Sequence, residues 1–297
     1  MTSEIEPATA DAIPEWETGL VELAEDVFAY VQAGGGFCIA NAGLIAAPAG
    51  LTAIDALFTP SMTRAFLAEA GRVSNAPLRR LIDTHHHVDH TFGNQFFAGA
   101  EIIAHALTRA EMQRVGLPIE RLTAAAPRLA PELHDIVLTL PTLTYDGSMT
   151  VYSGRRRLQL FHLGPAHTID DTLVFLPDEK ILFAGDVAFF YVTPLAFEGN
   201  ISGWIDVAGK ILEMDIEWIV PGHGPIGGKP ELALMREYLV RVRDQARQGF
   251  ESGLSAEATA AAIDLGRYAA WTEFERILPN TQRLYREFRG ELQDGGR

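Results

Sequence analysis

The feature that most constrains this chain is a run of metal-binding side chains, His85-x-His87-x-Asp89-His90, placed where a predicted strand ends. The run follows residues 77–82, a short, largely apolar segment typical of a buried strand. Loops at strand ends are where binding sites are commonly built. Because side chains alternate along an extended chain, we expect His85 and His87 to point to the same side and Asp89 and His90 to face a second position. One motif can therefore supply ligands to two metal ions.

Three more residues of metal-binding type follow far downstream, each beside glycine or proline and each after a strand-like apolar segment. They are His167, Asp186 and His223. Histidine and carboxylate ligands that leave a position for water are typical of catalytic zinc. Two metals about 3.5–4 Å apart can share a hydroxide at neutral pH. A lone His-x-His pair would be weak evidence, since surface and core histidines are common, but all seven residues together predict a metal-dependent hydrolase.

The order of the seven residues and the residues next to them resemble the sequence motifs of the metallo-β-lactamase superfamily. The resemblance covers roughly residues 21–228 and implies an α/β fold, the four-layer αββα sandwich. It also implies two ligand sets and a bridge, namely His85, His87 and His167 for the first metal, Asp89, His90 and His223 for the second, and Asp186 between them. The expected metals are two zinc ions, with iron or manganese also compatible with such ligands.

Finer details place the chain within this superfamily. Residues 41–45 and 164–185 are similar to segments of zinc β-lactamases, but Asp186 stands where those enzymes carry a metal-binding cysteine. An aspartate there is similar to the glyoxalase II, lactonase and thioesterase branches. Phe189 stands where the lactamases carry a lysine that grips the carboxylate of the drug. We therefore expect an ester, lactone or thioester rather than an antibiotic as the natural substrate.

The resemblance implies a mechanism in which a metal-bridging hydroxide attacks a substrate carbonyl. Asn200, after Gly199, resembles the loop asparagine of the lactamases and could donate to the oxyanion. Asp89 or water would pass a proton to the leaving group. Tyr191 is a further candidate, because a phenol near the metals could steady the oxyanion or protonate the leaving group.

The neighbourhood of the motifs supports further predictions. The aromatic residues at 189–191, with Phe197 and Trp204, favour an apolar or aromatic substrate if they line the cleft, although each alone could equally be packing. Asp83 or Asp170 could orient ligand imidazoles. The four histidines not expected to be ligands are His86, His105, His134 and His162, and we expect His86 to face away from the metals.

Three alternatives remain open. A β-lactamase would keep the same ligands and cleave an amide. A mono-iron persulfide dioxygenase is another activity that the superfamily supports, although one iron needs fewer than seven ligands. A non-catalytic protein could keep the fold as a binding module, although such a protein usually loses a ligand first.

The amino-acid composition indicates which kinds of binding partner to expect. The 39 acidic residues exceed the 24 basic ones, giving a net charge of −15, so a nucleic-acid backbone would be repelled on average. The first residues carry acidic side chains and no apolar core, unlike a secretory leader, so we expect a cytoplasmic protein. Residues 27–54 are uncharged, but glycine and proline interrupt them, so we expect no membrane span there. The single cysteine, Cys38, is expected to be buried. We expect a small-molecule substrate, and a homo-oligomer is compatible with the sequence.

The chain is divided into a tail at 1–19, the metallo-hydrolase domain at 20–229 and a helical extension at 230–297. Residues 20–55 predict three strands, and Thr59-Pro60 predicts the start of a helix that runs to about residue 70. A short strand is expected at 101–104 and a run of strands from 136–140 onward. A helix should follow Asn200, and apolar spacing predicts helices after residue 230. The extension could pack against the core or a partner, or serve as a substrate platform.

Overall fold

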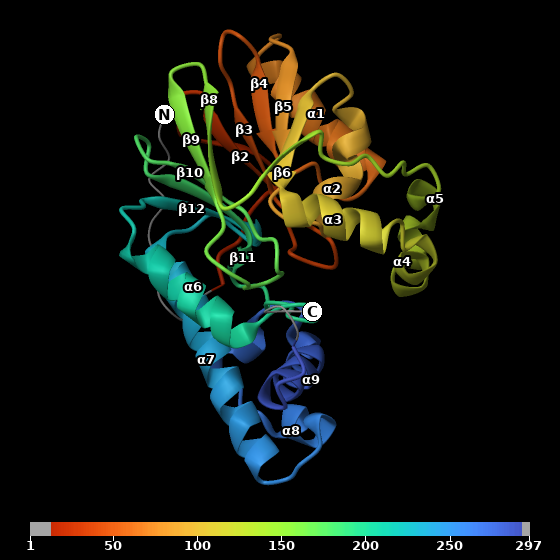
Figure 1. The fold of residues 1–297 in the computed structure, drawn as a ribbon, viewed down its shortest axis with the longest axis vertical. Coiled ribbons are helices and arrows are strands. Elements are labelled where there is room, and N and C mark those ends of the chain that lie inside the picture. Colours follow the sequence, from red (N-terminus) through yellow and green to blue (C-terminus); the bar gives the residue numbers. More distant parts are fainter. Residues whose placement is uncertain (1–12, 293–297) are drawn as a thin grey trace.

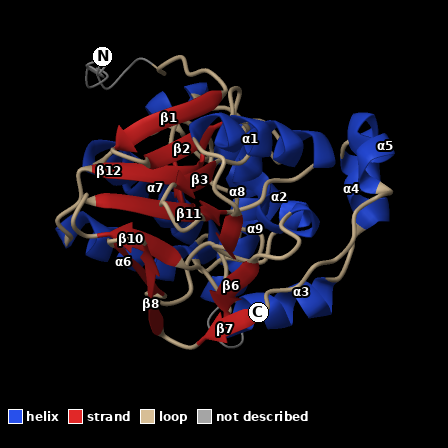
Figure 2. Ribbon diagram, turned by 90° about the horizontal axis from the view of Figure 1, so that it is seen from above, coloured by secondary structure: helices blue, strands red, loops and turns tan. Residues whose placement is uncertain are grey.

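The computed structural model describes residues 13–292, which form two β-sheets packed face to face with helices on both outer sides (Figures 1 and 2). The seven-stranded sheet has its strands in chain order. These strands are β1 (Gly19–Ala24), β2 (Val27–Val31), β3 (Ala42–Ile45), β4 (Leu51–Ile54), β5 (Leu78–Ile82), β6 (Glu101–His105) and β7 (Leu143–Tyr145). The five-stranded sheet has the order β12-β11-β10-β9-β8. Its strands are β8 (Ser148–Ser153), β9 (Arg156–Phe161), β10 (Leu173–Leu176), β11 (Ile181–Phe189) and β12 (Trp218–His223).

The helices of the first half of the chain are α1 (Pro60–Val73), α2 (Val88–Thr91), α3 (Ala106–Val115), α4 (Ile119–Ala125) and α5 (Ala130–Leu133), with short 3₁₀ turns η1 (Phe92–Phe96) and η2 (Pro127–Leu129). Those of the second half are α6 (Ile201–Glu213), α7 (Lys229–Glu251), α8 (Ala256–Ala262) and α9 (Ile277–Phe288), with η3 (Gly266–Ala270) and η4 (Phe274–Arg276). In Figure 1 the blue C-terminal helices α7, α8 and α9 lie below the strands. No helix of residues 13–292 combines the length and apolar character needed to cross a bilayer.

Alternation along the strands builds the layers. In β2, Val27, Ala29 and Val31 enter the core between the two sheets, whereas Tyr30 packs with Phe66 of α1 on the outer face. In β11, Ile181 and Phe183 enter the same inter-sheet core, and Leu182 and Ala184 face α6 and α7. Because successive strand side chains point to opposite faces, each sheet can bury both of its faces. The result is the four-layer αββα sandwich that the sequence predicts.

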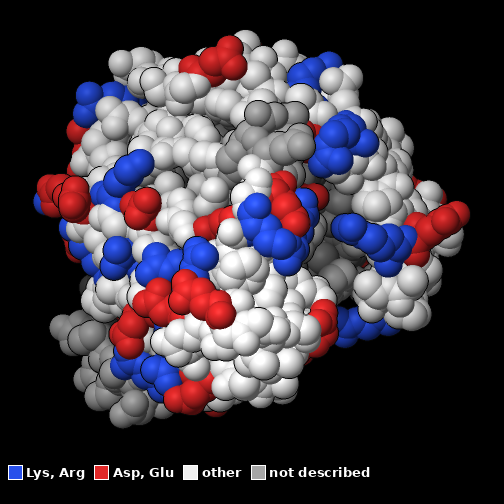
Figure 3. Space-filling view, turned by 60° about the horizontal axis from the view of Figure 1, so that its bottom comes forward, with Lys and Arg blue, Asp and Glu red and all other residues white. Residues whose placement is uncertain are grey.

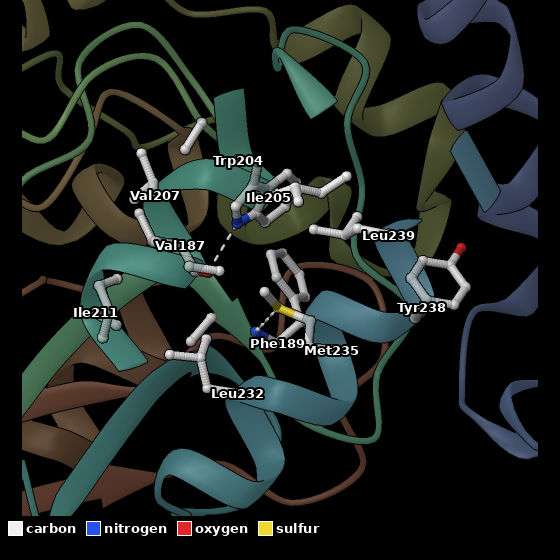
Figure 4. Close-up of a cluster of buried hydrophobic side chains, with 14 of the residues drawn as sticks. Val187, Phe189, Trp204, Ile205, Val207, Ile211, Leu232, Met235, Tyr238 and Leu239 are labelled. Carbon is white, nitrogen blue, oxygen red and sulfur yellow. Dashed lines mark hydrogen bonds between the residues drawn. The ribbon is translucent and has the colours of Figure 1, made fainter. Parts of the chain in front are cut away.

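The second helical layer fixes the strand that carries Asp186. Trp204 and Met235 belong to the helices α6 and α7 that cover β11 (Figure 4). The indole Nε1 of Trp204 donates to the Val187 carbonyl at 2.8 Å, and the amide of Phe189 donates to the Met235 sulfur at 3.2 Å (Figure 4). These bonds position the end of β11, on which Asp186 lies.

Most predicted elements are present, with two corrections. The segment 20–55 holds four strands in place of three, because β1 and β2 form a tight hairpin that the sequence alone does not separate. No strand forms at 136–140, and β7 begins only at Leu143. The physical reason is that backbone groups of this segment bond to side chains instead of a ladder: Val137 donates to Gln95, and the Thr139 carbonyl accepts from Asn94.

Helix starts and the chain ends can be compared in the same way. Thr59 caps α1 by accepting from the Met62 amide, as predicted, but the helix continues to Val73. Of the predicted tail, residues 1–12 lie outside the described residues, and Trp16 already contacts the core by donating from Nε1 to the Gln32 carbonyl. The predicted extension begins at α7, whose residues at helical spacing, Leu232, Met235, Leu239, Val242 and Ala246, are all buried.

Candidate dinuclear metal centre

The seven predicted ligands meet where the two sheets present their strand ends. His85 and His87 lie in the loop after β5, and α2 starts directly after His87, which places Asp89 and His90 in its first turn. His167 comes from the β9–β10 loop, Asp186 from within β11, and His223 from the last position of β12. Six of the seven residues are buried, and His87 is half-buried.

Asp186 lies at the centre of this group. Its Oδ2 is 3.2 Å from His167 Nε2, 3.4 Å from His223 Nε2 and 3.9 Å from His85 Nε2. Its other oxygen, Oδ1, is 3.0 Å from His90 Nε2. One carboxylate therefore faces histidines of both predicted ligand sets, the position expected of a bridging ligand.

The remaining distances divide the group as the sequence predicts. His87 Nδ1 and His167 Nε2 are 2.9 Å apart, and with His85 and Asp186 they form one set of potential ligand atoms. Two ring nitrogens this close, beside a carboxylate, are suited to bind one cation together. His223 Nε2 is 3.3 Å from Asp89 Oδ2, and with His90 these residues form a second set.

The hydrogen bonding of these atoms tests whether the site fits metal ions. Among the described residues, the buried His85 Nε2 makes no hydrogen bond, and the buried atoms His90 Nε2 and Asp186 Oδ1 face only each other, at 3.0 Å. Buried polar atoms are almost always paired, so several unpaired atoms in one place need an explanation. Coordination supplies it, because a lone pair bound to a cation needs no hydrogen bond. The donor set thus fits two ions of zinc, iron or manganese type.

The outer nitrogens of the imidazoles are held by protein groups. His90 Nδ1 lies 2.8 Å from Asp55 Oδ2, and His223 Nδ1 lies 2.9 Å from the Ile39 carbonyl oxygen. Such partners fix the ring orientation and leave Nε2 facing the metal position. Asp55 was not among the predicted residues. Its place at the end of β4, next to the strand that leads to the motif, is the only sequence signal that could have indicated it.

Asp83 and Asp170, which were predicted to orient ligand imidazoles, contact other residues. Asp83 accepts from Asn94 Nδ2 at 2.8 Å, and Asp170 accepts from the His86 amide and lies 2.8 Å from His86 Nδ1. Asp170 therefore orients an imidazole, but one outside the two predicted ligand sets. The rings of His105 and His162 are tilted relative to each other, with centroids 5.2 Å apart. Among the described residues, neither histidine forms an ion pair with Asp186.

Glu198 is a second residue that the sequence did not indicate. One of its oxygens, Oε2, lies 3.1 Å from Nε2 of His86 and 3.1 Å from Nε2 of His87. His86 is thus close to the site and lines the cavity above it, although it was expected to face away. These three residues form a further group of potential ligand atoms, in which Glu198 holds the outer nitrogen of His87.

Burial and charge set the protonation of the site. Burial lowers the pKa of His167 to about 3, which favours the neutral imidazole that metals bind. Burial would raise the pKa of Asp186, but the imidazoles of His223, His90 and His167 hold it well below its usual range. Burial opposes the charged form of His86 as well, yet Asp170 and Glu198 raise its pKa to about 10.

A cavity of about 410 Å³ opens above the ligands. Phe189 and Phe197 line it, as predicted for aromatic residues of the cleft. The Phe189 ring stacks on His223 at 4.9 Å and the Phe197 ring on His87 at 5.1 Å between centroids. Both rings therefore exclude water from one side of the ligands.

The other aromatic and catalytic candidates lie elsewhere. Trp204 is fully buried under β11, and the Tyr191 ring packs 6.4 Å from that of Trp271. Asn200 caps α6, its Oδ1 accepting from the Gly203 amide at 2.8 Å. Neither Tyr191 nor Asn200 is among the described residues that line the cavity, so this placement gives no support to an oxyanion or proton-transfer role for them.

Comparison with known proteins agrees with this geometry. The family model of the metallo-beta-lactamase superfamily matches residues 35–223, more than half of the chain. The chain therefore belongs to the metallo-β-lactamase superfamily, as the sequence motifs predict. Proteins with this fold are mostly metal-dependent hydrolases, the class expected for this chain.

Individual relatives are distant. The chain is similar to a linear primary-alkylsulfatase from Pseudomonas sp. (strain ATCC 19151), with 22% identity over 84% of this chain and 56% of the relative. It is also similar to the 2,4-dinitroanisole O-demethylase subunit alpha from Nocardioides sp. (strain JS1661), with 28% identity over 59% of this chain and 49% of the relative. The chain thus spans about half the length of these two relatives.

Solved structures show the same fold. A metallo-beta-lactamase from Pontibacter korlensis aligns with a TM-score of 0.60 and 18% identity, covering 75% of this chain and 99% of that one. The DIM-1 metallo-beta-lactamase aligns with a TM-score of 0.60 and 20% identity, covering 77% and 99%. The alignments confirm the predicted fold class.

Proposed function

We propose that this chain is a dinuclear metal-dependent hydrolase that cleaves an ester, lactone or thioester bond of an apolar or aromatic small molecule. The observation that carries the proposal is the convergence of six potential metal-binding side chains around Asp186, beneath a cavity partly lined by aromatic rings. Zinc ions bound by these residues would lower the pKa of water and polarise the bond under attack.

The protein's own groups would position the substrate and protect the site. Phe189 and Phe197 offer flat apolar surfaces beside the ligands, which favours an apolar or aromatic group next to the scissile bond. Asp89 lines the cavity, and its carboxylate lies 3.3 Å from His223. This position supports the proposal that Asp89 holds or passes a proton. No lysine stands at the Phe189 position to hold the carboxylate of a β-lactam, which argues against antibiotic hydrolysis.

A sulfate ester is a second candidate substrate. It is supported by the similarity to a linear primary-alkylsulfatase, which extends over 84% of this chain. The net charge of −15 supports a small-molecule substrate over a nucleic acid for either candidate.

Metal content and activity, measured on one preparation, test the proposal. We expect about two zinc ions per chain and hydrolysis within a panel of aryl ester, lactone, thioester, alkyl sulfate and nitrocefin, abolished by a chelator. Asp186→Ala should lose metal and turnover together. One iron per chain with oxygen consumption and no hydrolysis would indicate the dioxygenase, turnover of nitrocefin alone would indicate a β-lactamase, and a protein without metal or activity would indicate a binding module.

A further inference from the structure

A second cavity, of about 370 Å³, adjoins the one above the metal ligands. The two cavities share five wall residues, namely His86, Arg114, Arg121, Phe197 and Glu198. A molecule in the first cavity could therefore extend past the Phe197 ring into the second, while the bond to be cleaved stays beside Asp186.

Arginines dominate the walls of this second cavity. Arg114 comes from α3 and Arg121 from α4, whereas Arg283 and Arg286 come from α9 on the opposite wall. Figure 3 shows a hollow on this side of the molecule with Lys and Arg side chains (blue) at both of its margins. The arginines of this one cavity thus come from segments more than 150 residues apart in the sequence, since Arg121 and Arg283 differ by 162 positions.

The carboxylates in this cavity do not balance the arginines. Four arginines and two glutamates line it. Glu111 pairs with Arg114 at 2.6 Å, and Glu198 accepts from His86 and His87. Arg286 has its nearest described carboxylate, Glu291, at 3.9 Å. Arg283 donates to the backbone carbonyls of Glu198 and Gly199, which holds its guanidinium at the wall of the cavity.

This local positive charge contrasts with the rest of the molecule. The chain carries a net charge of −15, so an anion would be repelled by most of its surface. Burial and the neighbouring Arg286 lower the pKa of Arg283 to about 10, against the opposing effect of Glu198 and Glu287. Guanidinium groups present planar pairs of donors that match carboxylate, sulfonate and phosphate oxygens.

We propose that this arginine-lined cavity binds an oxyanion at the end of the substrate remote from the scissile bond. The preferred substrate is then an amphiphile, with the reactive bond at the metals, an apolar body against Phe197, and a carboxylate, sulfonate or phosphate between α4 and α9. The inference rests on the proposed function and adds the substrate class to it.

Two esters of equal length test the site: the mono-para-nitrophenyl ester of suberic acid, which ends in a carboxylate, and the same ester capped with a methyl group. Arg121→Gln and Arg286→Gln should each lower kcat/KM for the carboxylate ester about tenfold, mainly through KM, and change the capped ester less than twofold. The matched controls Arg128→Gln and Arg155→Gln remove exposed arginines outside the cavity and should leave both esters unchanged.

A binding measurement separates this inference from the proposed function. Calorimetric titration with octanesulfonate, which cannot be hydrolysed, should show weaker binding in Arg121→Gln and Arg286→Gln than in the wild type or the controls. If no ester is cleaved but this difference is found, the anion site stands and the hydrolase proposal fails. If both esters are cleaved equally by all variants and the sulfonate affinity does not change, the anion site is overturned and the hydrolase proposal stands.

Discussion

At the scale of single residues, the outer contacts of the imidazoles matter as much as the ligands. Asp55 accepts from the Thr84 amide and hydroxyl as well as facing His90, so its carboxylate is fixed from two sides. Glu198 has a similar relation to His87. Neither residue is close in sequence to the histidine that it holds, since Asp55 precedes His90 by 35 positions and Glu198 follows His87 by 111.

The Asp55 contact leads to a prediction about metal affinity. Asp55→Asn should weaken metal binding by roughly 10- to 100-fold, because an outer partner of a ligand imidazole sets its orientation and basicity. Competition with a chromophoric chelator measures the affinity. Asp83→Asn is the matched control, since Asp83 is equally buried but contacts Asn94 in place of a ligand. Equal affinities for the two variants would contradict this role of Asp55.

Cys38 gives a prediction about pH. Burial raises the pKa of its thiol well above the ordinary value, and the Asp89 carboxylate adds to the effect. Ellman's reagent should therefore react slowly with the native protein at pH 8 and rapidly after unfolding. Since the folded pKa lies above the unfolded one of about 8.5, this thiol stabilises the fold fully below pH 8.5 and loses that contribution as pH rises toward the folded pKa. Fast native labelling at pH 8 would show the thiol to be accessible and ionised.

At the scale of elements, the C-terminal helices hold a wall of the site. Asn280 of α9 accepts from the Ala196 amide at 2.8 Å and donates to the Pro194 carbonyl at 2.8 Å. Arg276 donates to the Thr193 carbonyl at 2.8 Å. These bonds fix residues 193–199, the segment between β11 and α6 that carries Phe197 and Glu198. The extension therefore packs on its own chain and holds the segment that supplies Phe197 and Glu198 to the cavity. A role of the extension as a substrate platform stays a prediction.

A substitution of Asn280 tests whether α9 holds residues 193–199 in place. Asn280→Ala should lower the free energy of unfolding by about 1–3 kcal/mol, because it leaves buried backbone groups of the segment unpaired. We also expect a higher KM with little change in metal content. Denaturant titration and steady-state kinetics measure the two effects. Gln282→Ala, an exposed position on the same helix, should change neither. An Asn280 variant with wild-type KM would show that α9 does not shape the site.

Across the whole molecule, the two sheets are joined at the site. The side-chain Nδ2 of Asn41, at the entrance to β3, donates to the carbonyls of Pro221 and Gly224 on either side of His223. Gly222 lies so close to Asp186 that an added Cβ would be 1.9 Å from its Oδ1. Each half of the sandwich therefore contributes ligands that keep their places only while the sheets stay packed.

This arrangement predicts a coupling between metal and global stability. Asp89 follows a strand of one sheet and Asp186 lies in a strand of the other, and both buried carboxylates lie near Nε2 of His223. Removing metal with EDTA should lower Tm by several degrees, since a ligand at 100 times its Kd adds about 2.7 kcal/mol to the folded state. Differential scanning calorimetry with and without added zinc measures the change. An unchanged Tm would mean that the ligands do not bind metal in the folded state.

The sequence by itself determined the layers of the fold and the seven candidate ligands. The seven candidate ligands follow or end strand-like segments and have recognisable neighbours in the sequence, and the apolar periodicity separates strands from helices. Only the tertiary structure decided the roles of Asp55, Glu198 and the arginines of the second cavity. Their contacts join segments that no local spacing relates, because hydrogen bonds and charges across packed sheets and helices depend on which strand ends and loops come together. For the same reason the structure, and not the sequence, placed Asn200 and Tyr191 outside the cavity.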